Sequence, residues 1–393
     1  MSKPFTKSSL LKSFASVYGS SRGARVFFAP GRVNLIGEHT DYNGGHVFPC
    51  AITLGTALAI RPRKDRFIHL CSRNIPRAGI ITVSLDELDY APIHGWANYP
   101  KGIFVTLAEQ GYTCPCGADL YYSGNLPNSS GLSSSACIEV LTAYALSELF
   151  GWKLEPVEIA KLSQRSENRY NGVNCGIMDQ FAIAMGRPSQ AIFLDTGTMK
   201  YEYVPLELGD YRLLIMNTNK RRGLADSKYN ERRAECEDAL RCLQARLNAA
   251  SLGALTDAEF EKNAGLIADP VKRKRAKHAV SENQRTIKAV SALRAGDLAE
   301  FARLIDASGD SLREDYEVTG PELDTLVAAA RKQPGVLCAR MTGAGFGGCA
   351  IALVEASRLK KVIRAVGTRY RRVIGYDASF YEACPGGGPC ELK

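Results

Sequence analysis

The chain has 393 residues, more than one ordinary hydrophobic core accommodates, and this length predicts two domains. Its content of 45% hydrophobic and 23% charged residues is typical of a water-soluble globular protein, and we expect no membrane partner. The formal net charge of +9 comes with no recognisable nucleic-acid-binding module, so we expect no nucleic-acid partner. The N-terminus is polar and lacks the layout of a secretory signal, which predicts a cytoplasmic protein.

Twelve cysteines are scattered along the chain without a CxxC pair. In a chain of this length that pattern predicts free, buried thiols rather than disulfides or a metal site. Cys384 and Cys390 are the exception, because they lie in a glycine-rich C-terminal tail whose composition suits a flexible segment.

Strands and helices alternate in the first half of the chain. Apolar and period-two patterns predict strands at residues 26–29, 47–60, 67–71, 80–83, 119–123, 190–195 and 211–217. Apolar spacings of three and four residues predict helices at residues 3–19, 101–110, 132–150 and 156–169, and another that begins near 176. The polar stretch after the first strand, up to residue 41, is expected to form a loop, and 41–45 a turn.

The composition changes in the second half. Residues 225–332 are rich in Ala, Leu, Arg, Lys and Glu and predict nearly continuous helix. Strands at 336–341 and 349–354, a helix and a final strand follow. The layout predicts an α+β fold, which we divide into an N-terminal domain, 1–205, and a C-terminal domain, 206–393.

A serine-rich turn leads directly into the helix predicted at 132–150. Its hydroxyls at Ser133, Ser134 and Ser135 lie at a helix start, where backbone N–H groups have no intrahelical partner and the macrodipole is positive. Gly131 lets a phosphate approach the backbone, and serine hydroxyls can complete a Mg²⁺ shell. Serine is also favoured as a helix cap, so this segment alone leaves a purely structural interpretation open.

A second polar stretch follows the first predicted strand. Within ten residues it contains the charged or strongly hydrogen-bonding side chains of Arg32, Asn34, Glu38, His39 and Asp41. Such density suits a polyhydroxylated ligand or a charged transition state. A metal site at His39 lacks the usual ligand spacing, and a solvated turn remains the structural alternative.

Asp179 follows a glycine-flanked turn and is surrounded by apolar residues. A carboxylate there could act as a base or pair with an arginine. Glu167, on the preceding helix, would ordinarily be a surface charge.

Two further motifs have an ordinary interpretation. Gly343, Gly345 and Gly348 match GxGxxG, but a predicted strand follows them, which excludes a dinucleotide-binding fold and leaves a tight turn near a phosphate or plain close packing. The segment 195–198, Asp-Thr-Gly-Thr, occurs once, whereas an aspartic protease needs two such carboxylates, so we predict a turn. There is no GxxxxGK[ST] phosphate loop in the sequence.

Taken in order, these segments resemble the GHMP small-molecule kinases and, within them, the galactokinases. The resemblance rests on a sugar signature at 31–42, the serine motif at 131–136, the stretch 175–181, a match at 227–233 and the glycine motif at 342–348. It covers nearly the whole chain. It implies a ribosomal-S5-like N-terminal domain, a ferredoxin-like C-terminal domain and an active site in the cleft between them.

The resemblance also implies an activity: transfer of the γ-phosphate of ATP to the C1 hydroxyl of α-D-galactose by a monomer that uses Mg²⁺. Asp179 would take or orient the hydroxyl proton, and Arg32 would stabilise developing charge. The residues implied in sugar binding are Glu38, His39, Thr40, Asp41 and Tyr229. Those implied in ATP binding are Ser129, Ser130, Gly131, Leu132, Ser133, Ser134 and Ser135. Mg²⁺ would be held by Ser135 and Glu167.

Ser129 stands where the family usually has a glycine, and we expect altered nucleotide affinity without loss of activity. Two alternatives remain at this point: a kinase of a related sugar such as N-acetylgalactosamine, and a sensor that binds ATP and galactose without turnover. The presence of Ser135, Arg32 and Asp179 favours an enzyme.

Overall fold

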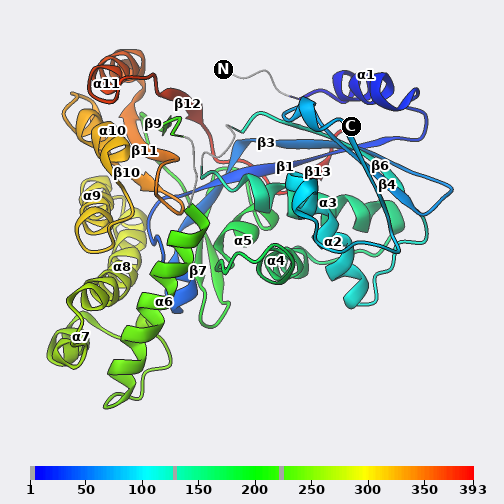
Figure 1. Ribbon diagram of the computed structural model, residues 1–393. Helices are drawn as coiled ribbons and strands as arrows, with labels where there is room; N and C mark the ends of the chain where they lie inside the picture. Colours follow the sequence, from blue (N-terminus) through cyan, green and yellow to red (C-terminus); the bar gives the residue numbers. More distant parts are fainter. Residues whose placement is uncertain (1–4, 127–130, 221–224) are drawn as a thin grey trace.

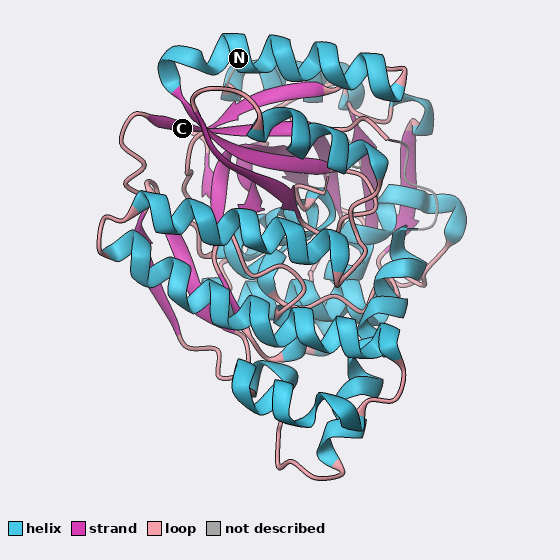
Figure 2. Ribbon diagram, turned by 90° about the vertical axis from the view of Figure 1, so that its left-hand side faces the viewer, coloured by secondary structure: helices cyan, strands magenta, loops and turns pink. Residues whose placement is uncertain are grey.

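The computed structural model describes residues 5–126, 131–220 and 225–393. Figure 1 shows two regions, one built on a large sheet with helices α1–α5 and the other on a smaller sheet with helices α6–α11. Figure 2 shows the molecule from the side on which α8–α11 lie in Figure 1. Among the described residues, no helix combines the length and the apolar character that crossing a bilayer requires. The predicted division at residue 205 stays a prediction.

The large sheet has six strands in the order β13-β1-β3-β6-β4-β5. Their bounds are β1 Arg25–Asn34, β3 Pro49–Pro62, β4 Phe67–Ser72, β5 Ile80–Ser84, β6 Ala118–Gly124 and β13 Cys390–Glu391. Only the β4–β6 pair among them is parallel. A separate sheet joins β2 His46–Val47, β7 Gln190–Asp195 and β8 Tyr201–Pro205.

Alternating side chains bury both faces of the large sheet, as period-two strands require. On one face, Val26 and Ala57 pack beneath helix α1, Lys7–Tyr18. On the other, Phe27 and Leu58 belong to the main core. That core is covered by the helices α2 Asn98–Glu109, α3 Ser134–Phe150, α4 Pro156–Arg165 and α5 Met178–Ala184.

The smaller sheet has the order β10-β11-β9-β12, with β9 Tyr211–Asn217, β10 Val336–Thr342, β11 Cys349–Glu355 and β12 Ser379–Ala383. Leu214 and Ala350 face a second core, whereas Leu213 and Ile351 face the main core. The sheet therefore joins the two cores. The helices of this half are α6 Ala225–Gln244, α7 Asp257–Asn263, α8 Pro270–Arg294, α9 Leu298–Glu314, α10 Pro321–Arg331 and α11 Leu359–Ile374.

The structure corrects four sequence-based expectations. β1 continues past residue 29 to Asn34, with a register irregularity between Pro30 and Arg32, so Arg32 lies on a strand and not on a loop. The helical stretch 225–332 is divided by turns into α6–α10, and β8 and β13 were missed. The C-terminal tail is not a loose segment, because the Gly386 and Gly388 N–H groups bond to Ala51 and Gly186. Cys384 and Cys390 are free and exposed.

Candidate active site

Arg32 of β1 and Asp179 of α5 meet in a two-pronged ion pair. The Arg32 Nε and Nη2 groups each donate to an Asp179 carboxylate oxygen at 2.8 Å, and Nη1 donates to the Gly131 carbonyl at 2.7 Å. Burial disfavours the arginine charge, but the carboxylates of Asp179 and Glu38 outweigh it and raise the Arg32 pKa. The Asp179 side chain keeps 28% exposure against 3% for Arg32, so the carboxylate can still meet a ligand.

The described part of the serine turn contacts the same carboxylate. Ser133 has a left-handed backbone (φ 59°) at the cap of α3, and its hydroxyl donates to Asp179 Oδ2 at 2.5 Å. Ser134 and Ser135 form the first turn of α3, as predicted, so backbone N–H groups and the positive end of the helix dipole lie beside the ion pair. Leu132 is buried and offers only backbone here. Ser129 and Ser130 lie outside the described residues.

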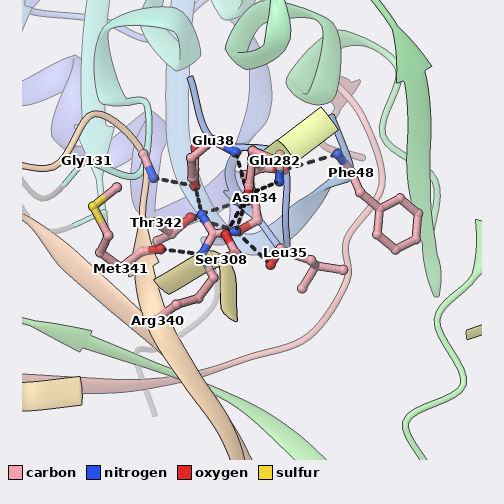
Figure 3. A network of polar contacts seen from close by, with 12 residues as sticks. Asn34, Leu35, Glu38, Phe48, Gly131, Glu282, Ser308, Arg340, Met341 and Thr342 are labelled. Atoms are coloured by element: carbon pink, nitrogen blue, oxygen red, sulfur yellow. Dashed lines mark hydrogen bonds and ion pairs between the residues drawn. The ribbon is translucent and has the colours of Figure 1, made fainter. Parts of the chain in front are cut away.

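Glu38 is held from the second half of the molecule. Arg340 of β10 lies 2.8 Å from Glu38 Oε1, and the Gly343 N–H donates to the same oxygen at 2.8 Å. Glu282 of α8 accepts the Gly37 N–H at 3.0 Å. Figure 3 shows Glu38, Glu282 and Arg340 converging in one polar network. Glu38 is 1% exposed, and burial raises its pKa against the lowering effect of the arginines.

His39 lies among aromatic rings. Its Nδ1 is 2.7 Å from the Tyr42 hydroxyl, and its ring packs against Tyr229 and Tyr316 at centroid distances of 5.5 and 4.8 Å. Burial lowers the His39 pKa to about 3, so the imidazole is neutral at neutral pH. The same burial raises the pKa of the Tyr229 hydroxyl.

Asp41 projects from a short 3-10 turn toward α5. Its Oδ2 accepts the Met178 N–H at 3.3 Å. The backbone of Gly176 passes so close that a Cβ there would lie 1.9 Å from the same oxygen. Burial, together with the charge of Asp179, raises the Asp41 pKa to about 6.

Thr40 braces the loop instead of facing the pocket. Its hydroxyl is within hydrogen-bond distance of the Gly37 and His46 carbonyls, at 2.9 and 2.7 Å, and the residue is fully buried. Because the Thr40 hydroxyl bonds to the backbone of its own loop, we assign it a structural role and not a contact with the ligand.

Glu167 lies in a helical turn after α4 and is only 7% exposed, so its interpretation as a surface charge is wrong. Its carboxylate accepts the Gln180 amide at 2.6 Å. Glu139 of α3, fully buried, lies close enough for burial and the Glu167 charge to raise its pKa well above the usual value.

Sequence reasoning missed four residues around the site, Glu139, Gln180, Glu282 and Arg340. A signal existed for two of them. Arg340 interrupts an apolar strand and Glu139 an apolar helix, and a charge at such a position predicts a buried polar contact. Nothing in the sequence says which partner each would meet.

Most of the predicted site residues line one pocket of about 150 Å³, whereas the four residues that sequence reasoning missed lie behind its wall. The predicted site residues on its wall are Arg32, Glu38, His39, Asp41, Gly131, Ser133, Ser134, Ser135, Glu167, Asp179 and Tyr229. Of the other predicted residues within the described ranges, Thr40 and Leu132 are not on the wall. The glycine motif contributes Gly343 and Ala344, and a Cβ on Gly343 would lie 2.6 Å from the Gly131 carbonyl, so the two glycine turns touch.

Comparison with known proteins agrees with this geometry. Family models match at residues 12–62, the galactokinase galactose-binding signature, and at 98–187 and 289–372, the N-terminal and C-terminal domains of the GHMP kinases. The galactokinase of Lactiplantibacillus plantarum is 54% identical over 98% of this chain and 99% of its own. That of Levilactobacillus brevis is 56% identical over 94% and 95%.

Solved structures extend the comparison. Lactococcus lactis galactokinase, crystallised in complex with galactose, has a TM-score of 0.96 and 51% identity, covering 98% of this chain and 99% of that one. The mevalonate kinase of Methanococcus jannaschii, 21% identical over 93% of this chain and 100% of its own, shares the fold with a TM-score of 0.66.

The fold and the site thus define a kinase of the GHMP class, and the predicted fold class is confirmed. Sequence identities above 50% to galactokinases, over nearly the full length of the chain, identify the family within this class. The chain belongs to the galactokinases. It is a sugar kinase, as predicted, and membership of this family implies ATP as the phosphate donor.

Proposed function

We propose that the chain transfers the γ-phosphate of ATP to the C1 hydroxyl of α-D-galactose in the pocket between Arg32 and Tyr229. The observation that carries this proposal is the two-pronged Arg32–Asp179 pair on the pocket wall. Phosphoryl transfer depends mainly on positioned reactants and neutralised charge, and in GTPases an arginine at the transition state is worth roughly 10³–10⁵ in rate.

Asp179 is the group that accepts or orients the C1 hydroxyl proton. Its carboxylate is fixed by Arg32 and by the Ser133 hydroxyl, which leaves little rotational freedom to lose when substrate binds. Arg32 has a guanidinium anchored on both Asp179 and Gly131, so its positive charge is already in place when charge develops on the transferred phosphoryl group.

The sugar is bound by the loop after β1 together with α6. Asp41 and Tyr229 reach the pocket with groups that can pair with sugar hydroxyls, and the neutral His39 ring supports Tyr229. Glu38 offers its carboxylate from a position fixed by Arg340. A site built to bond one hydroxyl rejects an epimer that leaves its buried polar group unpaired.

The phosphates of ATP bind at the start of α3. Ser133, Ser134 and Ser135 line the pocket there, and a 17-residue helix directs its positive end at them. The neighbouring Gly343 turn closes the same corner without side chains. The predicted contacts of Ser129 and Ser130 stay predictions.

Mg²⁺ fits the donors available. It prefers hard oxygen ligands and keeps several waters, and Ser135 and Glu167 bring a hydroxyl and a carboxylate to one pocket. The described part of the chain holds no group of three or more His, Cys, Asp or Glu side chains suited to a metal ion. The ion would therefore rely on phosphate oxygens and water beside these two residues, and it would neutralise phosphate charge.

A cytoplasmic location is part of the proposal, since no disulfide joins the cysteines in the part of the chain that the structure describes, which suits a reducing compartment.

The experiment is an assay of purified protein with ATP, Mg²⁺ and a panel of hexoses that includes glucose and N-acetylgalactosamine. We expect ADP release that depends on galactose and a product phosphorylated at C1. Binding of galactose and an ATP analogue without ADP release would favour a sensor, and preference for N-acetylgalactosamine would assign a different substrate.

A further inference from the structure

The turn after β7 takes no part in the proposed reaction, yet it holds the loop that carries Asp41. The Thr196 hydroxyl lies 3.0 Å from the Asp41 carbonyl and 2.8 Å from the Gly45 carbonyl, and shares its hydrogen between them. The Thr196 N–H also donates to the Gly45 carbonyl at 3.1 Å. One residue thus fixes both ends of the segment from Asp41 to Gly45.

The turn that presents Thr196 is itself rigid. Asp195 Oδ1 accepts the N–H groups of Gly197 and Thr198 at 3.0 and 3.3 Å, and Oδ2 accepts the Thr198 hydroxyl at 2.7 Å. Asp195 is also paired with His46 in the β2–β7 ladder. Thr196 is therefore held by strand pairing on one side and by a closed side-chain turn on the other.

Asp41 has little room for error on its pocket side. Its Oδ2 receives the Met178 N–H, and the Gly176 backbone leaves no space for a methyl group beside that oxygen. A carboxylate confined in this way moves whenever its own backbone moves. The Thr196 hydroxyl, which donates to the Asp41 backbone carbonyl, therefore helps to fix the Asp41 carboxylate.

We propose that Thr196 is a positioning residue that fixes the Asp41 carboxylate and thereby sets affinity and selectivity for the sugar. Thr196 does not line the pocket, so it acts through Asp41 and not on the ligand. The inference rests on the proposed function, in which Asp41 pairs with a galactose hydroxyl.

Three variants test it. Thr196→Val removes the hydroxyl and keeps the shape of the side chain, whereas Thr196→Ser keeps the hydroxyl. Thr198→Val removes a hydroxyl whose hydrogen bonds stay within the turn itself. Losing one such hydrogen bond corresponds to a change of about 3–10-fold in a binding constant. We expect Thr196→Val to raise the galactose KM by this factor with kcat nearly unchanged, and to narrow the kcat/KM gap between galactose and glucose.

Thr196→Ser should keep the parent KM for galactose. Thr198→Val loosens the turn but leaves the Thr196 hydroxyl on the Asp41 carbonyl, so it should raise the KM less than Thr196→Val does. An unchanged KM in Thr196→Val, or an equal rise in Thr198→Val, would overturn the proposal.

A double variant guards against a general loss of structure. If Thr196 acts through Asp41, Asp41→Asn/Thr196→Val binds galactose no more weakly than Asp41→Asn alone, whereas additive losses would overturn the proposal. Calorimetric galactose binding without ATP separates this inference from the proposed function. A parent that binds galactose but releases no ADP refutes the reaction, while weaker binding by Thr196→Val would still support the positioning role.

Discussion

The Arg340 guanidinium lies 2.8 Å from the Glu38 carboxylate, and both side chains are almost completely buried, at 0% and 1% exposure. The pair ties strand β10 to the loop after β1, so the second half of the molecule determines where Glu38 sits. A buried ion pair offsets its desolvation only while both partners are present.

Arg340→Met is therefore expected to destabilise the protein strongly, by about 3–5 kcal/mol, because it leaves Glu38 buried without its arginine. Arg340→Met/Glu38→Gln should recover most of that loss, since it removes both charges. Urea unfolding at pH 7 measures the free energies. Equal destabilisation of the single and double variants would mean that the pair is not the source of the effect.

Asp41 is expected to cost stability at neutral pH. Its pKa is raised from the usual 3.8 to about 6, so folding favours the protonated acid, and its contribution to stability is lost as pH rises from about 4 through about 6. Asp41→Asn should thus raise the melting temperature at pH 8 and change it little at pH 4. Scanning calorimetry of the parent and Asp41→Asn at both pH values tests this. A lower melting temperature of Asp41→Asn than of the parent at pH 8 would contradict the raised pKa assigned to Asp41.

Galactose affinity should fall below about pH 6 for the same reason. Protonation turns the Asp41 carboxylate into a weaker acceptor for a sugar hydroxyl. Calorimetric titrations between pH 5 and 8 should show this fall in the parent and not in Asp41→Asn, which binds more weakly throughout. His39 cannot cause the fall, because its pKa of about 3 keeps it neutral over this range. A pH-independent affinity in the parent would remove Asp41 from the sugar site.

Glu167→Gln should raise the Mg²⁺ concentration needed for half-maximal activity and lower turnover, because a neutral amide is a poorer ligand for a hard cation. Galactose binding without nucleotide should stay near the parent value. Glu155→Gln, at an exposed position before α4, is the matched control and should leave the Mg²⁺ titration unchanged. Superimposable titrations for Glu167→Gln and the parent would exclude Glu167 as a ligand.

Local signals in the sequence predicted the parts of the site that depend on local structure. Ser134 begins α3 because a polar, glycine-containing turn precedes an apolar helix face, and the stretch after Gly176 forms α5 for a similar reason. The resemblance to a known family, and not periodicity, brought Arg32 and Asp179 together.

The remainder depends on long-range contacts that periodicity does not encode. β1 runs through Pro30 and Gly31 because β3 pairs with it on both sides of an irregular register. The local sequence pattern alone predicts that the strand ends at the proline. The burial of Glu167 comes from helices that pack around it, and the fixed position of Glu38 comes from Arg340, far along the chain. Thr196 likewise gains its partners only once β7 pairs with β2.

The most direct test of the proposed reaction compares binding with turnover in Asp179→Asn. This change keeps the size of the side chain and some of its hydrogen bonds to Arg32 and Ser133, but removes the carboxylate that meets the C1 hydroxyl. We expect the affinities for galactose and an ATP analogue to stay near those of the parent while galactose-dependent ADP release is lost, the pattern of an interaction used mainly in the transition state. Retention of most of the parent rate by Asp179→Asn would contradict the catalytic role assigned to this residue.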